Sequence, residues 1–387
     1  MGNLPIKPNA VDTNSSLDKK TPLTRGLFRN TIFNIFGWIW PVGLAFFTVP
    51  YILRGLGTEA YGVFGLVSIT AGYLGLLNSP MAFGNIRFMA EAYGRQDWIE
   101  FYKYVFAGLW VSLVLTGAGA LVMILASGIL ARQVFKIPNE LILDATRVFR
   151  LAAVSFFFNG ITSVLQGIPS AQRKYGVLNI ISVVVGTLNT IGIVVAIWLK
   201  WGLFGAVVAQ LLSSLFAVFV FGILAFKLLS NSNSADIHIG PDWPTIKNLL
   251  KYSSYLFVSQ VMSTIGLQLD KTLVGILFGA SSVTFYTIPS KIIDQIPGLT
   301  GRFTIALYPL SAESNATGRL QELKELYVRM IRSILLLSSF IVTLIVAFSH
   351  YILALWVGND IANKSSLLLS ILALSTIWRG TGSVCYQ

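Results

Sequence analysis

The chain has 387 residues, of which 55% are hydrophobic and 11% are charged, and its formal net charge is +12. A soluble protein carries about 25% charged residues, so this composition excludes a water-soluble globular protein and indicates an integral membrane protein. The single cysteine, Cys385, excludes an internal disulfide framework and a cysteine-ligated metal cluster. In a soluble chain the positive charge would suggest nucleic acid, but here we expect it to reflect membrane orientation. We therefore predict no nucleic-acid partner and no metal site.

Residues 1–30 are polar and basic, and they lack the short apolar core and cleavage site of a signal peptide. Lys and Arg are also more abundant in the connectors on the same side of the membrane as this tail. By the positive-inside rule, we expect residues 1–30 to form a cytoplasmic N-terminal tail.

After the tail come ten apolar runs, each of a length suited to crossing about 30 Å of hydrocarbon. None alternates with the period of a transmembrane strand, so we predict helices and an all-α polytopic membrane protein. The expected spans are residues 31–53, 59–83, 104–130, 148–169, 177–199, 202–229, 252–277, 282–309, 329–357 and 366–387.

The two parts of the sequence resemble each other at a nearly constant offset. "LGTEAYGVF" (56–64) falls on "FGASSVTFY" (278–286) at an offset of 222, and "NGITSV" (159–164) falls on "RGTGSV" (379–384) at 220. A repeat of this kind is typical of duplicated helix bundles.

We therefore predict two pseudo-symmetric bundles around a central cavity. The N-lobe would cover six spans in residues 31–229, and the polar residues 230–251 would form a cytoplasmic linker between the lobes. The C-lobe would occupy residues 252–387, with about four spans where the N-lobe has six. We expect this second bundle to be truncated by about two helices.

Sequence motifs for catalysis are missing. There is no GxxxxGK[ST] phosphate loop, and the two histidines, His238 and His350, are far apart in the sequence. The acidic residues of the connectors fit solvated amphipathic helices. We therefore predict a transporter, with no catalytic residues and no cofactor, and not an enzyme.

The stretch "KIIDQIPGLTGRF" (291–303) places Lys291, Asp294 and Arg302 inside an expected span. A charge at the centre of a bilayer costs at least about 2.5 kcal/mol, so such residues face a bundle interior or a water-filled cavity. On one continuous helix the three residues would share a stripe, and Lys291 and Asp294 would pair. Pro297 permits a bend.

Other charges accompany this stretch at or near the ends of expected spans, and the whole set is mainly cationic, which suits an anionic phosphate ligand. The alternative is structural, with a closed ion pair between helices and an Arg302 side chain that extends to the interface. The candidate binding and translocation residues are Lys291, Arg302, Asp294, Asp270, Arg379, Arg87 and Arg54.

Four passages carry a resemblance to a known family. They are "TVPYILRGLGTEAYGVFGLVSITAGYLGLLN" (48–78), "RFMAEAYG" (87–94), "GLFGAVVAQ" (202–210) and "QLDKTLVGILFGASSVTFYTI" (268–288). Over roughly residues 27–387 the chain resembles bacterial polysaccharide transporters. These form the O-antigen flippase family of the multidrug/oligosaccharidyl-lipid/polysaccharide exporter superfamily.

This resemblance implies two lobes that alternate between inward and outward openings in the bacterial cytoplasmic (inner) membrane. The implied cargo is an anionic undecaprenyl-pyrophosphate-linked oligosaccharide, which a polysaccharide polymerase would then consume as a partner. Basic cavity residues bind the headgroup in the family, and the matching positions here are Lys291, Arg302 and Arg87. A coupling ion, H⁺ or Na⁺, could use Asp294 or Asp270.

Two alternatives stay open at this point. A cation-coupled multidrug exporter of the same superfamily often has a carboxylate in its first helix, but residues 31–53 contain no Asp or Glu. A membrane-bound glycan polymerase or transferase would need a long outer loop with catalytic side chains. The segment 131–147 is short and resembles a connector.

Overall fold

The computed structural model describes residues 21–230, 240, 242–296 and 320–385. Every regular element in these residues is helical, which confirms the predicted all-α class. The long helices are α1 (Thr21–Gly94), α2 (Trp98–Ile129), α3 (Ile142–Ala171), α4 (Tyr175–Trp198), α5 (Gly202–Ser230), α6 (Trp243–Phe278), α7 (Ala280–Ile293), α10 (Leu320–Val357) and α11 (Asn359–Cys385). A π-helical turn (Leu130–Val134) and a 3₁₀ turn (Asn139–Leu141) connect α2 to α3.

Seven helical segments in the described part of the chain are long and apolar enough to cross a membrane. They are Ile39–Gly94, Trp98–Val134, Asn139–Ala171, Tyr175–Trp198, Gly202–Ser230, Trp243–Phe278 and Tyr327–Val357. The first segment has 56 residues, more than twice the roughly 20 that one crossing needs. It contains most of the first two predicted spans.

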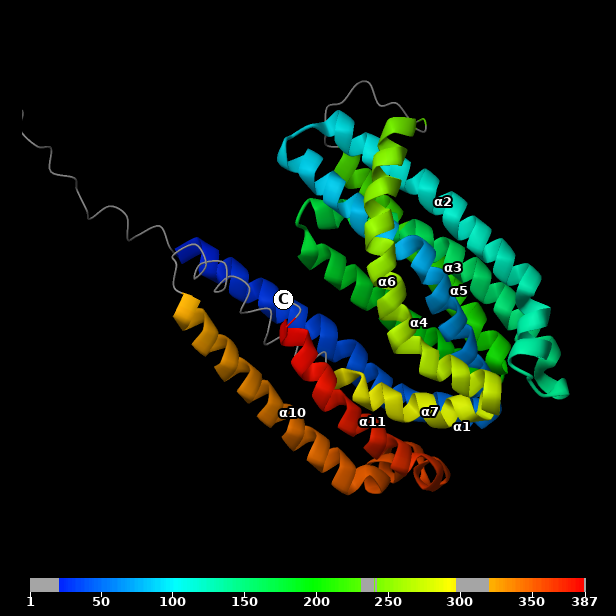
Figure 1. Cartoon of the computed structure of the whole chain (residues 1–387). Coiled ribbons are helices and arrows are strands. Elements are labelled where there is room, and N and C mark those ends of the chain that lie inside the picture. The colour runs from blue at the N-terminus through cyan, green and yellow to red at the C-terminus, as the bar shows by residue number, and fades with distance from the viewer. Residues whose placement is uncertain (1–20, 231–239, 241, 297–319, 386–387) are drawn as a thin grey trace, which may run out of the picture.

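The chain reverses direction within α1 at Gly57. Its φ of 80° and ψ of 168° are not helical, and a positive φ of this size is favourable only for glycine. Figure 1 shows the dark-blue first part of α1 and its lighter second part running in opposite directions from this point. The glycine therefore separates the predicted spans 31–53 and 59–83.

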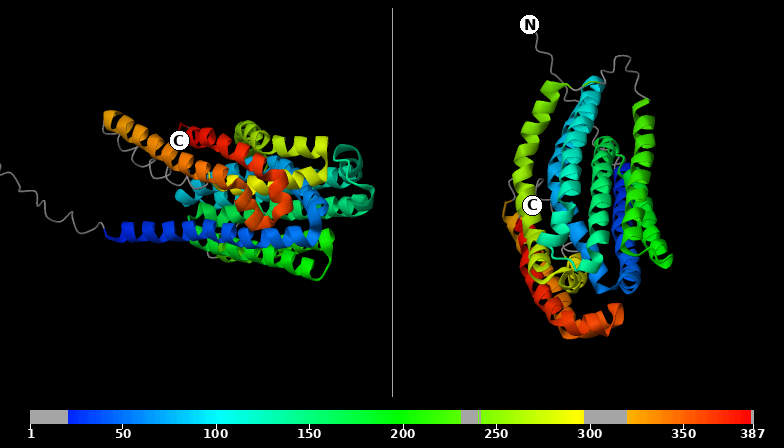
Figure 2. Two further views of the ribbon diagram at one scale, coloured as in Figure 1. Left: turned by 90° about the horizontal axis from the view of Figure 1, so that it is seen from below. Right: turned by 90° about the vertical axis from the view of Figure 1, so that its right-hand side faces the viewer.

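The helices pack through two large clusters of buried side chains. One cluster joins the second part of α1 to α2, α3, α5, α6 and α7, with Leu66, Met123, Phe149, Val207 and Val283 among its members. In Figures 1 and 2, α10 and α11 lie side by side at one edge of the molecule, away from α2 and α3.

The other cluster joins the first part of α1 to α4, α5, α7, α10 and α11. Among its members are Leu53, Ile197, Ile288, Leu353 and Leu369. Helix α7 contributes buried side chains to both clusters, so it lies at the junction between them.

Two helices begin well before the spans that hydropathy predicts. Asp97 caps α2, because its Oδ1 accepts a hydrogen bond from the Glu100 amide at 2.9 Å. Asp242 caps α6 by accepting from the Thr245 amide at 3.3 Å, so α6 includes residues 243–251 of the expected linker. The apolar runs mark the membrane-facing part of each helix, whereas the capping carboxylates decide where the helix starts.

Helix α7 ends at Ile293, and Asp294 forms a turn. The predicted uninterrupted helix over residues 282–309 is therefore wrong at Asp294, although Lys291 and Asp294 of the predicted stripe still line one cavity. The sequence supplies the reason, because Pro297 has no N–H to donate to the carbonyl of Ile293 four residues earlier. Residues 297–319, including Arg302, lie outside the described residues.

Helices α1 and α7 touch backbone to backbone. A Cβ at Gly62 would lie 1.8 Å from the carbonyl oxygen of Ala280, which is far closer than two such atoms can approach. Beside this contact, Thr284 Oγ1 donates a hydrogen bond to the carbonyl of Thr58 at 2.6 Å. Glycine at position 62 is therefore required for the seating of α7 on α1.

We expect Gly62→Ala to destabilise the protein by about 1–3 kcal/mol, because the new methyl group overpacks the contact with Ala280. The measurement is thermal unfolding of the purified full chain in detergent. Gly75→Ala is the matched control in the same helix, because a Cβ there meets nothing within 4 Å. A Gly62→Ala variant as stable as the control would show that the close contact is absent.

Candidate functional site

A cavity of about 540 Å³ lies between the second part of α1, the end of α6 and α7. It contains three charged groups, Lys271, Lys291 and Asp294, and the rest of its lining mixes polar and apolar side chains. The lining residues are Tyr61, Phe64, Gly65, Ser68, Ile69, Leu267, Gln268, Lys271, Thr287, Lys291 and Asp294. This cavity is the candidate site.

Helical periodicity explains how residues from three elements meet here. Tyr61, Gly65 and Ser68 follow steps of four and three along α1, which places them on one face of the helix. In the same way, Thr287 and Lys291 are one turn apart on α7. The close contact at Gly62 holds these two faces next to each other.

Lys291 is oriented by an aromatic partner on α1. Its Nζ donates a hydrogen bond to Tyr61 Oη at 2.8 Å and lies 5.3 Å from the centre of the Tyr61 ring. The hydrogen bond and the cation–π attraction both fix the position of the ammonium group. An ammonium has three donors, so two remain for a ligand.

Asp294 pairs with Lys271 of α6, with 3.3 Å between Oδ2 and Nζ. The predicted pairing of Asp294 with Lys291 is therefore wrong: Asp294 pairs with Lys271 of α6, whereas Lys291 bonds to Tyr61 of α1. The Lys271 and Asp294 side chains are 21% and 41% exposed. A pair this exposed contributes about 0–1 kcal/mol to stability, so its main effect is to position the two groups.

Asp270 is close to the cavity but does not line it. Its carboxylate accepts hydrogen bonds from the Tyr286 hydroxyl and, at 2.7 Å, from the backbone N–H of Lys271. Asp270 therefore links α6 to α7 beside the cavity.

The remaining predicted site residues are not brought into this cavity. Arg54 is exposed near the end of the first part of α1. Arg87 lies 26 residues beyond Tyr61 on α1, or about 40 Å along the helix, where its guanidinium stacks 4.3 Å from the centre of the Tyr252 ring. Arg302 and the side chain of Arg379 lie outside the described residues.

The list of candidate residues drawn from the sequence omits five polar or charged residues that line the cavity: Tyr61, Ser68, Gln268, Lys271 and Thr287. Gln268 Oε1 is buried without a hydrogen-bond partner in the described part of the chain, and a Cβ at Gly72 would lie 2.3 Å from its Nε2. All five are polar positions within expected apolar spans, which is the signal that could have marked them.

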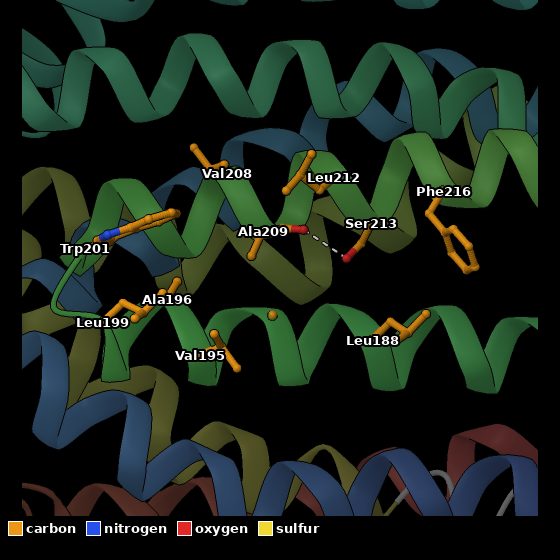
Figure 3. A pocket seen from close by; sticks show the side chains of 12 residues that line it. Leu188, Val195, Ala196, Leu199, Trp201, Val208, Ala209, Leu212, Ser213 and Phe216 are labelled. Carbon is orange, nitrogen blue, oxygen red and sulfur yellow. Dashed lines mark hydrogen bonds between the residues drawn. The ribbon is translucent and has the colours of Figure 1, made fainter.

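A second cavity, of about 390 Å³, is an apolar groove between α4 and α5 (Figure 3). Its walls are formed by side chains such as Leu188, Val195, Leu212 and Phe216. Its one hydroxyl is satisfied within α5, because Ser213 Oγ donates to the Ala209 carbonyl at 2.9 Å. A groove of this chemistry suits hydrocarbon and not an anionic group.

The sequence model of the family described as "Polysaccharide biosynthesis protein" matches residues 54–366, which include all three charged residues of the candidate cavity. The chain belongs to this polysaccharide biosynthesis protein family. The resemblance inferred from the sequence is thereby confirmed.

Named relatives agree with this membership, and a solved structure has the same fold. The chain is 23% identical to the "Putative O-antigen transporter" of Shigella flexneri, covering 93% of this chain and 84% of that protein. A protein of the same name from Salmonella typhi is 20% identical, covering 89% and 79%. The inward-facing structure of a multidrug resistance MATE family transporter of the MOP superfamily has a TM-score of 0.66 at 18% identity, covering 89% and 81%. At that identity the likeness establishes a shared fold.

We expect a cysteine at position 291 to react with a membrane-impermeant maleimide, because Lys291 is exposed in the cavity. The background is Cys385→Ser, which removes the single native cysteine. Ile293→Cys is the matched control two residues away, since Ile293 is only 2% exposed. Labelling rates of the purified protein in detergent are the measurement, and equal rates at the two positions would contradict the cavity.

Proposed function

We propose that this protein flips an undecaprenyl-pyrophosphate-linked oligosaccharide across the bacterial cytoplasmic membrane for surface polysaccharide synthesis. Membership of the polysaccharide biosynthesis family and the fold shared with a transporter support transport as the general activity. The observation that carries the proposal is the cavity in which α6 and α7 present Lys271 and Lys291. Two ammonium groups against one carboxylate favour an anionic headgroup.

The contacts of the two lysines suggest how a pyrophosphate would bind. Lys291 is held by Tyr61 and keeps two donors for phosphate oxygens. Lys271 is paired with Asp294 in a partly exposed ion pair, which a more highly charged pyrophosphate can replace at little cost. Charge-assisted hydrogen bonds to phosphate then fix the headgroup, while the prenyl chain stays in the lipid.

Alternating access would change this cavity through α7. Ile288 of α7 packs in the cluster that contains α10 and α11, whereas Val283 packs in the cluster that contains α2 and α3. Rocking of one cluster against the other would therefore move α7 relative to α1 and open the cavity to alternate sides. No covalent step is required, and we propose that the N-terminus is cytoplasmic.

Two driving forces are compatible with the cavity. H⁺ or Na⁺ could be coupled through Asp294, which faces Lys271, or through Asp270 beside it. Consumption of the flipped product by a polysaccharide polymerase could also drive net transport. Neither requires a cofactor.

The charge of the cavity argues against export of cationic drugs. Lys271 and Lys291 would repel a cation, and Asp294 is already paired. A drug exporter would therefore need its acidic site elsewhere in the chain.

Complementation of a strain lacking its polysaccharide flippase tests the proposal. We expect the wild-type chain to restore surface polysaccharide, and Lys291→Ala to lower the amount at least about tenfold through loss of charge-assisted hydrogen bonds to the headgroup. Lys291→Arg, which keeps the charge, should retain most of the activity. Arg302→Ala belongs in the same set, because the family resemblance assigns that residue to the headgroup.

Arg147→Ala is the control, since Arg147 forms an exposed pair with Asp144 on α3, outside the cavity. All variants are compared at equal membrane abundance. A wild-type amount of surface polysaccharide with Lys291→Ala would show that the cationic site is not needed for transport. Raised drug resistance without restored polysaccharide would favour the multidrug exporter.

A further inference from the structure

A third cavity, of about 600 Å³, lies where the turn between α1 and α2 meets the turn between α3 and α4. The residues that α1 contributes to this cavity lie at the end of its second part, between Ile86 and Gly94. The residues that α1 contributes to the candidate transport cavity lie near the start of that part, between Tyr61 and Ile69. Six polar or aromatic side chains line it: Tyr93, Gln96, Trp98, Ser170, Arg173 and Tyr175, of which Ser170 donates its hydroxyl to the Gln166 carbonyl. Nothing in the proposed transport step uses it.

Apart from the Ser170 hydroxyl, the side-chain donors of this cavity lack partners in the described part of the chain. Within the residues that the structure describes, no hydrogen bond or ion pair engages the Arg173 guanidinium, the Gln96 amide or the Tyr175 hydroxyl. The same holds for the Tyr93 hydroxyl and the Trp98 indole N–H. This differs from the transport cavity, where Lys271 and Lys291 both have partners. Several free donors around one cation suit an acceptor-rich anion such as a phosphate.

Nearby carboxylates are occupied within the α1–α2 turn. Glu91 pairs with Arg95, which also lies 3.9 Å from Glu100. Asp97 Oδ1 caps α2 through the Glu100 amide. Arg173 is thus the one charged residue among those lining the cavity.

The walls become apolar along α1. From Gly94 the cavity extends to Ala90 and Ile86, a distance of about 12 Å along the helix. Ile86 packs on a fully buried cluster that includes Met89 and Phe101, so this wall is firmly supported. A ligand matched to the cavity therefore has an anionic head and a hydrocarbon portion.

The aromatic side chains of the cavity indicate that it lies at the level of the lipid headgroups. The Tyr93 and Trp98 rings meet edge to face with their centres 5.6 Å apart. Tyr and Trp are enriched where a membrane protein crosses the headgroup level, and basic pockets between helices at this level bind anionic lipid heads.

We propose that this cavity binds the headgroup of an anionic glycerophospholipid of the surrounding leaflet, on the side predicted to be cytoplasmic. The phosphate contacts Arg173, Gln96 and Tyr175, and the first acyl carbons lie on the wall of Ala90 and Ile86. The bound lipid joins the α1–α2 turn to the α3–α4 turn. This site is independent of the proposed cargo.

The test is thermal unfolding of the purified full chain in detergent, titrated with phosphatidylglycerol. We expect a saturable rise in melting temperature that phosphatidylcholine with the same acyl chains does not give. Arg173→Asn should raise the half-saturating phosphatidylglycerol concentration about fivefold. Asparagine tolerates the left-handed backbone at Arg173, where φ is +58°, so the turn itself is preserved.

Lys200→Asn is the matched control. Lys200 is also a cation with a positive φ of 60°, but it lies at the other end of α4 and does not line the cavity. Tyr175→Phe provides a second variant at an exposed position, and we expect it to raise the half-saturating concentration about twofold to fivefold.

Three outcomes would overturn the proposal. The first is an equal response to phosphatidylcholine, which would mean that acyl chains alone bind. The second is a full response to inorganic phosphate, which would identify a free anion as the ligand. The third is wild-type titration curves for both Arg173→Asn and Tyr175→Phe.

Discussion

The arrangement of the candidate site depends on the backbone contact between Gly62 of α1 and Ala280 of α7. Because no side chain separates the helices there, Tyr61 and Lys291 come within hydrogen-bonding distance. The same approach lets Thr284 reach the Thr58 carbonyl. In a membrane, where apolar side chains have no preference for each other over lipid, such close contacts and polar links are what hold helices together.

The charges of the site follow from this packing. Lys271, Lys291 and Asp294 come from the end of α6, from α7 and from the turn after it, and each has a partner on a different element. This distribution makes their arrangement sensitive to any movement between the two packing clusters. A site assembled in this way can change the arrangement of its charged groups as α7 moves, and so bind a ligand in one position of α7 and release it in another.

The sequence predicted the helical class, the membrane location and the family, because these depend on long apolar runs and on motifs at helix ends. It also identified Lys291, Asp294 and Asp270 as unusual charges. It did not predict the pairing of Asp294 with Lys271, since periodicity relates residues along one helix and this pair joins two elements. Nor could it place Arg87 outside the cavity, because the distance along α1 becomes meaningful only when the fold is known.

The short length of α7 has a consequence for hydration. Fourteen residues form a helix about 21 Å long, which is less than the roughly 30 Å of a hydrocarbon core. Gln295 Nε2 donates to the Lys291 carbonyl at 3.2 Å, but carbonyl groups at an interrupted helix end cannot face lipid. Water or protein must therefore surround the end of α7, so the backbone alone keeps lipid away from the region beside Lys291 even if every charge were removed.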